Sequence, residues 1–579
     1  MGQNQHKNDV IIGIDFGSSG VSFSYGFLNN QRTVPIQGFF DGQFSNNKLS
    51  TEIILDDNLN ILAFGNDCEG FLSSIKDKNI HHFKNIKMNL YKKKYKIKSR
   101  NSDKEVDIQF IIQLILQEIK KKALEQIKRT MPQLQDNNIH WIITVPAIWE
   151  IKSKQIMINA AQEAGLIRDD DDPSNFFALE PEAASLYYHN STQAQINNIE
   201  LGEPFIVCDF GGGTVDIVTQ KKVKNNNQFS KFEEVYRPLG GHDGCNLINE
   251  YFMDRVIKEL FGEQCFNETK NNKNMKNYNN WIELENKIEE KKKKFYKFEQ
   301  VNEYFQIDCF IFKTNCKKKN LNDLVENFNS KNKNWKLKID EDFKILFPYQ
   351  IFYDFMLEII NKMSEYIYEI MNSIKNVKSL IFTGGASANP IFQQMLQNIE
   401  ELRNINIVSS QNPEFAISNG SVYFSYDHNI ISPRKSKYSF GIKVRENWND
   451  KKHRNGGIKI CDKIDQKDKC ENLFSKFITI NDNIRPDREI IKSYLMCDSN
   501  VMVELYKTKE NNVTFINEVD NNGNLKIEKF GEFNIDVGND FDVKNRNVEV
   551  RMKMGATFIS CSATYCKTKK KAKMTCLFE

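Results

Sequence analysis

The chain lacks the segments that would place it in a membrane or in a secretory route. No apolar run among its 579 residues reaches the ~18–20 residues that a bilayer-spanning helix needs. Residues 1–9 are polar, without the apolar stretch of a signal peptide, and we expect them to be disordered. Met1-Gly2 is a weak myristoylation signal, because His6 stands where Ser or Thr is needed. We therefore expect a cytoplasmic protein with no membrane span.

Cysteine pairs, excess charge and several nucleotide-site motifs are missing as well. The 12 cysteines include no Cys-x-x-Cys pair, so we expect reduced thiols and neither a disulfide framework nor a zinc site. A net charge of only +4 gives no basic field for nucleic acid. The absence of Gly-Lys-Ser/Thr excludes a P-loop, and the absence of His-Arg-Asp and Val-Ala-Ile-Lys argues against a protein kinase.

What is present is a glycine-rich bend between two apolar runs. Residues 206–218 are I-V-C-D-F-G-G-G-T-V-D-I-V, which predicts a buried β-hairpin whose tip presents converging backbone N–H groups to an anion. Asp209 and Asp216 flank the tip and would repel a bare phosphate, so a divalent cation is expected between them. Taken alone, the same letters also fit an ordinary glycine-rich turn.

A second bend of the same type lies near the N-terminus. Residues 10–23 are V-I-I-G-I-D-F-G-S-S-G-V-S-F, again an apolar strand, an acid, glycine with hydroxyls, and an alternating strand. Two such hairpins predict a duplicated fold whose halves face one ligand across a cleft.

Two further motifs combine a strand end with a helix start. Glu180 precedes Pro181 at a strand-to-helix corner, where its carboxylate either faces the ligand or complements the helix dipole. Residues 377–383 form an apolar strand that ends in Gly384-Gly385 and is followed by a helix, an order suited to holding a nucleotide.

These motifs, in this order, resemble the actin/hexokinase/heat-shock-70 ATPase superfamily. Within it, the chain looks most like the divergent member-12 subfamily of the heat-shock-70 chaperones. The similar segments are residues 83–88, 141–149, 178–185 and 431–434. The resemblance covers essentially the whole chain and is more specific for the fold than for the activity.

The resemblance implies an α/β fold, with a duplicated actin-like (ribonuclease H-like) ATPase domain of two lobes. This domain would span residues 10–430, with the second lobe starting near residue 205. Residues 431–579 consist of short alternating segments separated by turn residues, which predicts a C-terminal all-β domain. The resemblance likens it to a diverged substrate-binding domain.

The resemblance also implies a site for Mg²⁺ and ATP or ADP between the lobes. Glu180, Asp209 and Asp216 would be catalytic, and Asp15 and Asp209 would hold Mg²⁺ through water. The phosphates would meet Asp15, Gly17, Ser18, Ser19, Gly211, Gly212, Gly213 and Thr214. Ribose and base would meet Gly240, Gly241, Gly384, Gly385 and Ala386, with Glu289, Lys292 and Lys293 on the adenine-side helix.

Some positions depart from the chaperone pattern. Glu69 is nearest the place of the usual catalytic lysine, Ala388 replaces an arginine that stacks on adenine, and His242 replaces an acid. We expect no helical lid, because no long helical pattern follows the β-rich segments. These departures favour nucleotide binding over brisk hydrolysis.

The resulting expectation is an ATP-binding, heat-shock-70-like chaperone of the stress response. It would hydrolyse ATP weakly, bind polypeptide clients under nucleotide control and meet nucleotide-exchange or co-chaperone proteins. The alternative is a nucleotide-dependent adaptor or scaffold with little or no hydrolysis. A small-molecule kinase on the same fold would not need the β-rich domain.

Four stretches carry local predictions that a structure can test. We expect an amphipathic helix at residues 108–129 and a helix around His81 and His82, whose adjacent positions make them packing or surface residues rather than ligands. The Asn/Lys-rich residues 267–280 predict a loop, and residues 304–313 predict β-structure.

Overall fold

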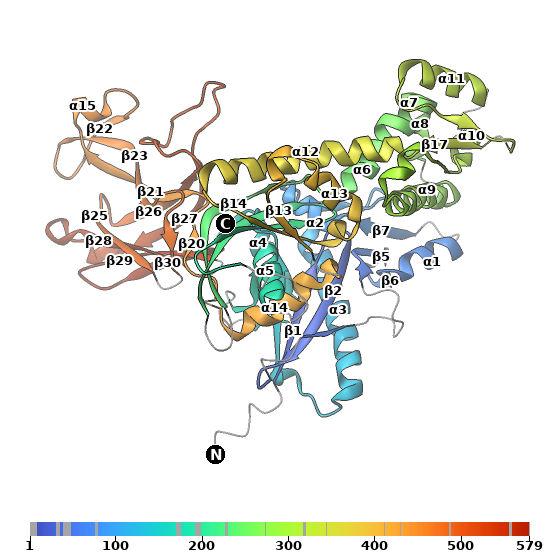
Figure 1. The fold of residues 1–579 in the computed structure, drawn as a ribbon. Coiled ribbons are helices and arrows are strands. Elements are labelled where there is room, and N and C mark those ends of the chain that lie inside the picture. The colour runs from blue at the N-terminus through green and yellow to red at the C-terminus, as the bar shows by residue number, and fades with distance from the viewer. Residues whose placement is uncertain are drawn as a thin grey trace.

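The computed structural model describes residues 9–30, 35–38, 48–75, 79–168, 175–190, 199–225, 230–272, 274–315, 320–342, 344–409, 412–428, 430–485, 488–554 and 558–577. They form a mixed α/β structure in which a strand-rich end lies to one side of a helix-rich body (Figure 1). The expected disorder of residues 1–9 falls almost wholly outside this range. Among the described helices, none combines the length and the hydropathy that crossing a bilayer requires.

The first sheet is built around β1 (Val10–Phe16), the strand that leads into the first glycine bend. Its order is β11-β10-β1-β2-β3, with β4 beside β2. β1 pairs antiparallel with β2 and parallel with β10, so the predicted hairpin is confirmed. The other strands are β2 (Gly20–Phe27), β3 (Ile36–Gln37), β4 (Leu49–Ser50), β10 (Ile139–Val145) and β11 (Phe177–Leu179).

The second sheet repeats this pattern around β12 (Pro204–Phe210). Its order is β14-β13-β12-β18-β19, with β13 antiparallel and β18 parallel to β12. In both sheets the central strand therefore has a hairpin partner on one side and a parallel strand on the other. The remaining strands are β13 (Val215–Asn225), β14 (Ser230–Gly241), β18 (Ser379–Thr383) and β19 (Asn406–Val408).

Helices cover both sheets because the apolar faces of the helices are buried against the sheets. α3 (Ile108–Thr130) confirms the predicted amphipathic helix, and its isoleucines belong to the hydrophobic core of the first sheet. α14 (Ala416–Tyr426) packs on β1, where a β-carbon built on Gly13 would lie 1.9 Å from Ser421 Oγ. The other helices of this part are α4 (Ile151–Glu163) and α5 (Glu180–Asn190).

The helices of the second half overturn two predictions. Residues 267–280 are largely helical, because Phe266 and Tyr278 are buried and tertiary packing outweighs the loop-like composition. Only Tyr304–Gln306 of the predicted β-stretch is a strand (β15), and Phe310–Asn315 is helix α10. The helices are α6 (Asn246–Tyr251), a π-helix (Phe252–Ile257), α7 (Lys258–Phe261), α8 (Glu263–Lys270), α9 (Met275–Lys294), α11 (Leu321–Lys331), α12 (Gln350–Ser373) and α13 (Pro390–Gln397). Two short strands accompany them, β16 (Lys338–Ile339) and β17 (Ile345–Pro348).

A small sheet of β5, β6 and β7 contacts α9, although α9 lies far away in the sequence. Residues His81 and His82 lie in β7 (Ile80–Lys84) rather than in a helix, and both are buried, so they are packing residues as expected. Leu72 and Ile80 share a hydrophobic cluster with Ile282 of α9. The elements of this region are β5 (Glu52–Asp56), β6 (Ile61–Phe64), α1 (Asp67–Ser74), α2 (Ile86–Tyr91), β8 (Lys96–Lys98) and β9 (Glu105–Asp107).

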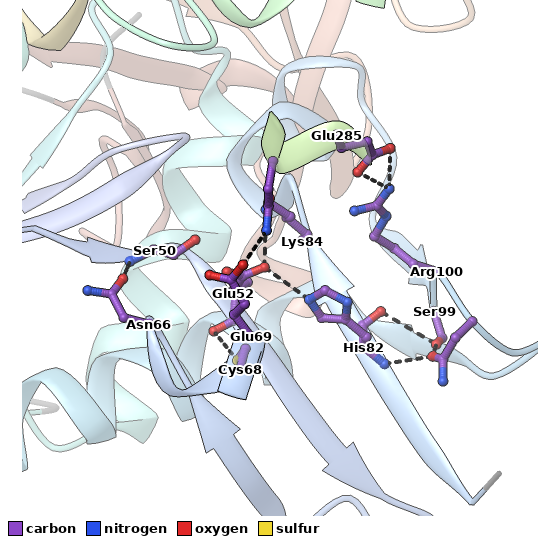
Figure 2. Close-up of polar contacts among 12 residues, drawn as sticks. Ser50, Glu52, Asn66, Cys68, Glu69, His82, Lys84, Ser99, Arg100 and Glu285 are labelled. Atoms are coloured by element: carbon purple, nitrogen blue, oxygen red, sulfur yellow. Dashed lines mark hydrogen bonds and ion pairs between the residues drawn. The ribbon is translucent and has the colours of Figure 1, made fainter. Parts of the chain in front are cut away.

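Polar contacts reinforce this junction (Figure 2). Arg100 makes two hydrogen bonds of 2.8 Å to the carboxylate of Glu285 on α9. His82 is hydrogen-bonded to Glu52 at 3.1 Å and to Tyr278 of α9 at 2.6 Å. The first and second halves of the chain are thus joined at a place separate from the two main sheets.

The C-terminal region consists of strands and short turns of helix in its described residues. Its strands are β20 (Arg434–Lys435), β21 (Ser439–Asn447), β22 (Lys459–Cys461), β23 (Asp468–Ile478), β24 (Asn483–Ile484), β25 (Glu489–Leu495), β26 (Asn500–Thr508), β27 (Glu528–Asp536), β28 (Asn547–Met554), β29 (Phe558–Tyr565) and β30 (Lys571–Leu577). A five-stranded and a four-stranded sheet contribute to one buried cluster. The longest α-helix here, α15 (Asp450–His453), has four residues, so no helical lid occurs in the described part of this region.

Cys265 of α8 is disulfide-bonded, so the expectation of uniformly reduced thiols is wrong at that position. Nine other described cysteines are not disulfide-bonded.

Candidate functional site

The two glycine bends touch each other. A β-carbon built on Gly212 would lie 2.0 Å from Ser19 Oγ, and one built on Gly213 would lie 2.5 Å from Ser18 Oγ. Asn246, at the start of α6, donates a hydrogen bond from Nδ2 to Ser19 Oγ at 3.0 Å. The predicted juxtaposition of the bends is therefore observed, although they are far apart in the sequence.

The first bend is fastened from the side of β4. The hydroxyl of Thr51 donates to the Gly17 carbonyl at 2.7 Å, and Ser50 is the ladder partner of Gly20. Lys48, just before β4, donates from Nζ to Asp15 Oδ2 at 2.8 Å. Thr51 and Lys48 were not among the predicted site residues, because nothing in their local sequence links them to the bend.

The second bend is backed by the start of α6 and by the turn after β18. The backbone N–H groups of Cys245 and Asn246 donate to the carbonyls of Gly211 and Gly212. Gly384 has a φ of +89°, and a β-carbon there would lie 2.3 Å from Asp209 Oδ1, so only glycine fits. This packing holds Asp209 and the bend as one rigid unit.

Four carboxylates gather beside the bends, and we call Asp15, Glu180, Asp209 and Asp216 the carboxylate cluster. Each is at most 4% exposed. Asp15 and Asp209 occupy equivalent places near the ends of β1 and β12, and Asp216 is the ladder partner of Asp209 on β13. Glu180 is the first residue of α5, the corner position predicted for it.

A lysine faces this cluster, which corrects the expectation attached to Glu69. Lys87 of α2 is buried and forms an ion pair with Glu180. Burial opposes its charge, but the carboxylates of Glu180, Asp15 and Asp216 outweigh that effect and raise the pKa of Lys87. Glu69 lies on α1 in the contact with α9 (Figure 2), where it accepts a hydrogen bond from Asn286 Nδ2 at 3.0 Å.

The cluster carries more negative charge than its two lysines balance. Burial raises the pKa of Asp209 to about 7, and the neighbouring Asp216 and Asp15 add to the effect. Burial likewise raises the pKa values of Glu180 and Asp216. Oδ1 of Asp209 and Oδ2 of Asp216 are buried without a hydrogen-bond partner. Unpartnered buried carboxylate oxygens are costly, so the donor set suits a cation.

Magnesium fits this donor set as an ion that keeps much of its water. It prefers oxygen ligands and usually takes only one or two carboxylates from a protein. In the described part of the chain, no three His, Cys, Asp or Glu side chains converge as a metal site. Water and phosphate oxygens would therefore have to complete the coordination.

The three residues expected on the adenine side all lie on α9, in the last two turns. Lys292 is buried and donates to the Cys245 carbonyl at 3.2 Å, and it pairs with Glu289 at 2.5 Å. Glu289 also accepts from Asn249 Nδ2 at 2.6 Å. Lys292 and Glu289 therefore join α9 to α6 behind the second bend, whereas Lys293 is exposed.

The predicted glycine pairs lie in different settings. Gly240 and Gly241 end β14 as ladder partners of Asp216 and Val215, rather than forming a loop. Gly385 has no atom within 4 Å of a β-carbon built on it, so open space adjoins it. Ala386 is buried beside it. His242 follows β14, and its ring lies 5.7 Å from that of Tyr91 on α2.

Similar proteins connect this geometry to a family. A family model described as "Domain of unknown function (DUF8340)" matches residues 200–401, the stretch from β12 to α13. The chain is 23% identical over 640 residues to heat shock 70 kDa protein 12A of Homo sapiens and of Mus musculus, a match covering 98% of this chain and 91% of each relative.

Over most of its length, the chain is similar to the heat-shock-70 member-12 proteins. Heat shock 70 kDa protein 12B of Homo sapiens also matches, at 19% identity over 582 residues, covering 89% of this chain and 82% of the relative. The mixed α/β structure, with its repeated strand pattern, fits an actin-like ATPase fold. The sequence resemblance to the heat-shock-70 group is thereby confirmed.

Proposed function

We propose that this protein binds Mg·ATP between its two glycine bends and hydrolyses it. The observation that supports this most strongly is the contact between Ser18–Ser19 and Gly212–Gly213 beside four buried carboxylates. Converging glycine-rich turns offer backbone N–H groups to phosphate, and the surplus negative charge calls for a divalent cation. The two main sheets would be the two lobes of the actin-like domain.

The residues would divide the work according to their positions. Asp15 and Asp209 would hold Mg²⁺ through water, and Glu180 and Asp216 would orient the attacking water. Bound Mg²⁺ would supply charge neutralisation for the transferring phosphoryl group. Lys87 would add a second positive charge there, because it already faces Glu180, Asp15 and Asp216.

Hydrolysis is expected to be less impaired than the sequence indicates. Among the departures that favoured a weakened site was an acid at the lysine position, and Glu69 lies on α1 instead. Ala388 still removes one stacking partner for the base. The remaining alternative is an adaptor that binds nucleotide with little or no turnover.

Calorimetric titration with ADP and a non-hydrolysable ATP analogue, each with and without Mg²⁺, tests the binding proposal. We expect Mg²⁺-dependent binding by the wild-type chain and loss of the Mg²⁺ dependence in Asp209→Asn, which halves the charge of the second bend. Absence of any binding by the wild type would refute the proposal. Single-turnover hydrolysis then separates an ATPase from an adaptor.

The C-terminal region is proposed to bind polypeptide clients. Two observations support this proposal. The two sheets of the region contribute to one buried cluster, and Arg434 at its start makes hydrogen bonds of 2.6 and 2.8 Å to Glu182 on α5. Fluorescence anisotropy of a labelled unfolded polypeptide, with and without nucleotide, is the test. Nucleotide-sensitive binding of one folded partner alone would favour the adaptor.

A further inference from the structure

Lys48 forms an ion pair with Asp15 of the carboxylate cluster. None of the roles proposed above involves this lysine. Its Nζ lies 2.8 Å from Asp15 Oδ2, and its side chain is 26% exposed while that of Asp15 is 3% exposed. The base of its side chain lies beside the end of the first bend, since a β-carbon built on Gly20 would lie 3.3 Å from Lys48 Cβ. The same carboxylate is the one proposed to hold the metal through water.

The two lysines of the cluster differ in how firmly they are held. Lys87 has a side chain 3% exposed, and its partner Glu180 is equally buried. Lys48 approaches from the partly exposed side on a long, flexible side chain. The charge of Lys48 also favours the ionised form of Asp209 in the second bend, so its ammonium group interacts electrostatically with both bends. Lys48 is therefore the lysine that can change partners.

We propose that Lys48 is a displaceable counter-ion of Asp15 and a phosphate-binding residue. Without ligand it neutralises Asp15. When Mg²⁺ arrives with a nucleotide, Asp15 turns to the hydrated metal, and the ammonium of Lys48 moves to the terminal phosphate. This inference rests on the proposed nucleotide binding and adds to it a coupling between metal and phosphate chain.

Two consequences follow from the exchange of partners. Metal alone binds weakly, because it must break the Lys48–Asp15 pair and leaves the lysine without a partner. A triphosphate binds better than a diphosphate, because the last phosphate receives the displaced ammonium. Charge-assisted hydrogen bonds of this kind are stronger than hydrogen bonds between neutral groups.

The test compares Lys48→Gln with wild type in two calorimetric titrations. In the first, Mn²⁺ is titrated without nucleotide, and Lys48→Gln is expected to bind it about tenfold more tightly because Asp15 is free. In the second, the non-hydrolysable ATP analogue and ADP are titrated with Mg²⁺. Lys48→Gln is expected to lose about tenfold for the analogue and far less for ADP.

Two control variants keep the result interpretable. Lys84→Gln removes a lysine from the Glu52 ion pair, outside the carboxylate cluster, and is expected to change neither titration. Lys48→Arg retains the charge and is expected to restore the preference for the triphosphate. Melting temperatures measured in parallel detect a loss of folding.

The outcomes separate the two proposals. If the wild type binds no nucleotide, the proposed function fails and the phosphate half of this inference fails with it. If nucleotide binds but Lys48→Gln weakens the analogue and ADP equally, or leaves both unchanged, Lys48 has no role at the terminal phosphate. Unchanged Mn²⁺ affinity in Lys48→Gln would overturn its role as counter-ion of Asp15.

Discussion

The two glycine bends join strands that are paired in the same way, but different kinds of contact hold the bends in place. The first is held by side chains, with the Thr51 hydroxyl on the Gly17 carbonyl and Lys48 on Asp15. The second is held by backbone, with α6 donating N–H groups to its carbonyls, while an oxygen of Asp209 stays buried without a partner. The first bend is therefore charge-balanced and adjustable, whereas the second is fixed by its backbone contacts and keeps a buried carboxylate oxygen without a hydrogen-bond partner.

The largest effect is expected from adding one methyl group to the rigid bend. In Gly212→Ala the new β-carbon would lie 2.0 Å from Ser19 Oγ, in the contact between the bends. We expect calorimetric nucleotide affinity to fall by about a hundredfold or more, because a misplaced phosphate cradle loses several contacts together. Gly70→Ala on α1 meets no atom within 4 Å and is the matched control, with affinity unchanged. Equal affinities of the two variants would contradict the assignment.

Lys87 and Glu69 provide the next comparison. Lys87→Met removes the buried partner of Glu180, and we expect single-turnover hydrolysis to slow by about 10²–10³-fold, as when one transition-state charge partner is lost. Glu69→Gln changes only an exposed contact with Asn286, so its rate should stay within about twofold of wild type. A slow Glu69→Gln with a normal Lys87→Met would reverse the assignment of the lysine.

The charge difference between the bends also predicts a pH dependence. Burial raises the pKa of Asp209 to about 7, so a proton must leave before a cation can bind there. We expect the affinity for Mg·ADP to rise between about pH 6 and pH 8, with proton release visible in buffers of different ionisation enthalpy.

The same raised pKa has a consequence for stability. The folded state holds this proton more tightly than the unfolded chain, so its stabilising effect is present at low pH and is lost as the pH rises towards about 7.

An affinity for Mg·ADP that stays constant over the range from about pH 6 to pH 8 would show that Asp209 does not control cation binding.

The smallest effect is expected at the side-chain anchor of the first bend. Thr51→Val keeps the shape of the side chain and removes the hydrogen bond to the Gly17 carbonyl. We expect a loss of about 1 kcal/mol in the free energy of unfolding and a modest loss of nucleotide affinity, measured by denaturant titration and calorimetry. Thr51→Ser is the control and should retain both. A larger loss of affinity than in Gly212→Ala would contradict the rigidity assigned to the second bend.

Local sequence patterns were sufficient to predict the strands and helices around the bends. Alternation and apolar runs predicted both hairpins, the corner at Glu180 and the helix of residues 108–129, because strand and helix periods are local properties. They failed where packing decides: His81 and His82 lie in a strand, and the Asn/Lys-rich residues 267–280 are mostly helical. Buried aromatic neighbours stabilise those helices, and composition does not report them.

The sequence by itself determined which residues form the two bends and that acids accompany each of them. Only the tertiary structure decided which positive charges meet those acids, bringing Lys87 and Lys48 to the cluster and leaving Glu69 on α1. The physical reason is that a glycine bend is defined by neighbours in the chain, whereas an ion pair forms between side chains that folding brings together from distant segments.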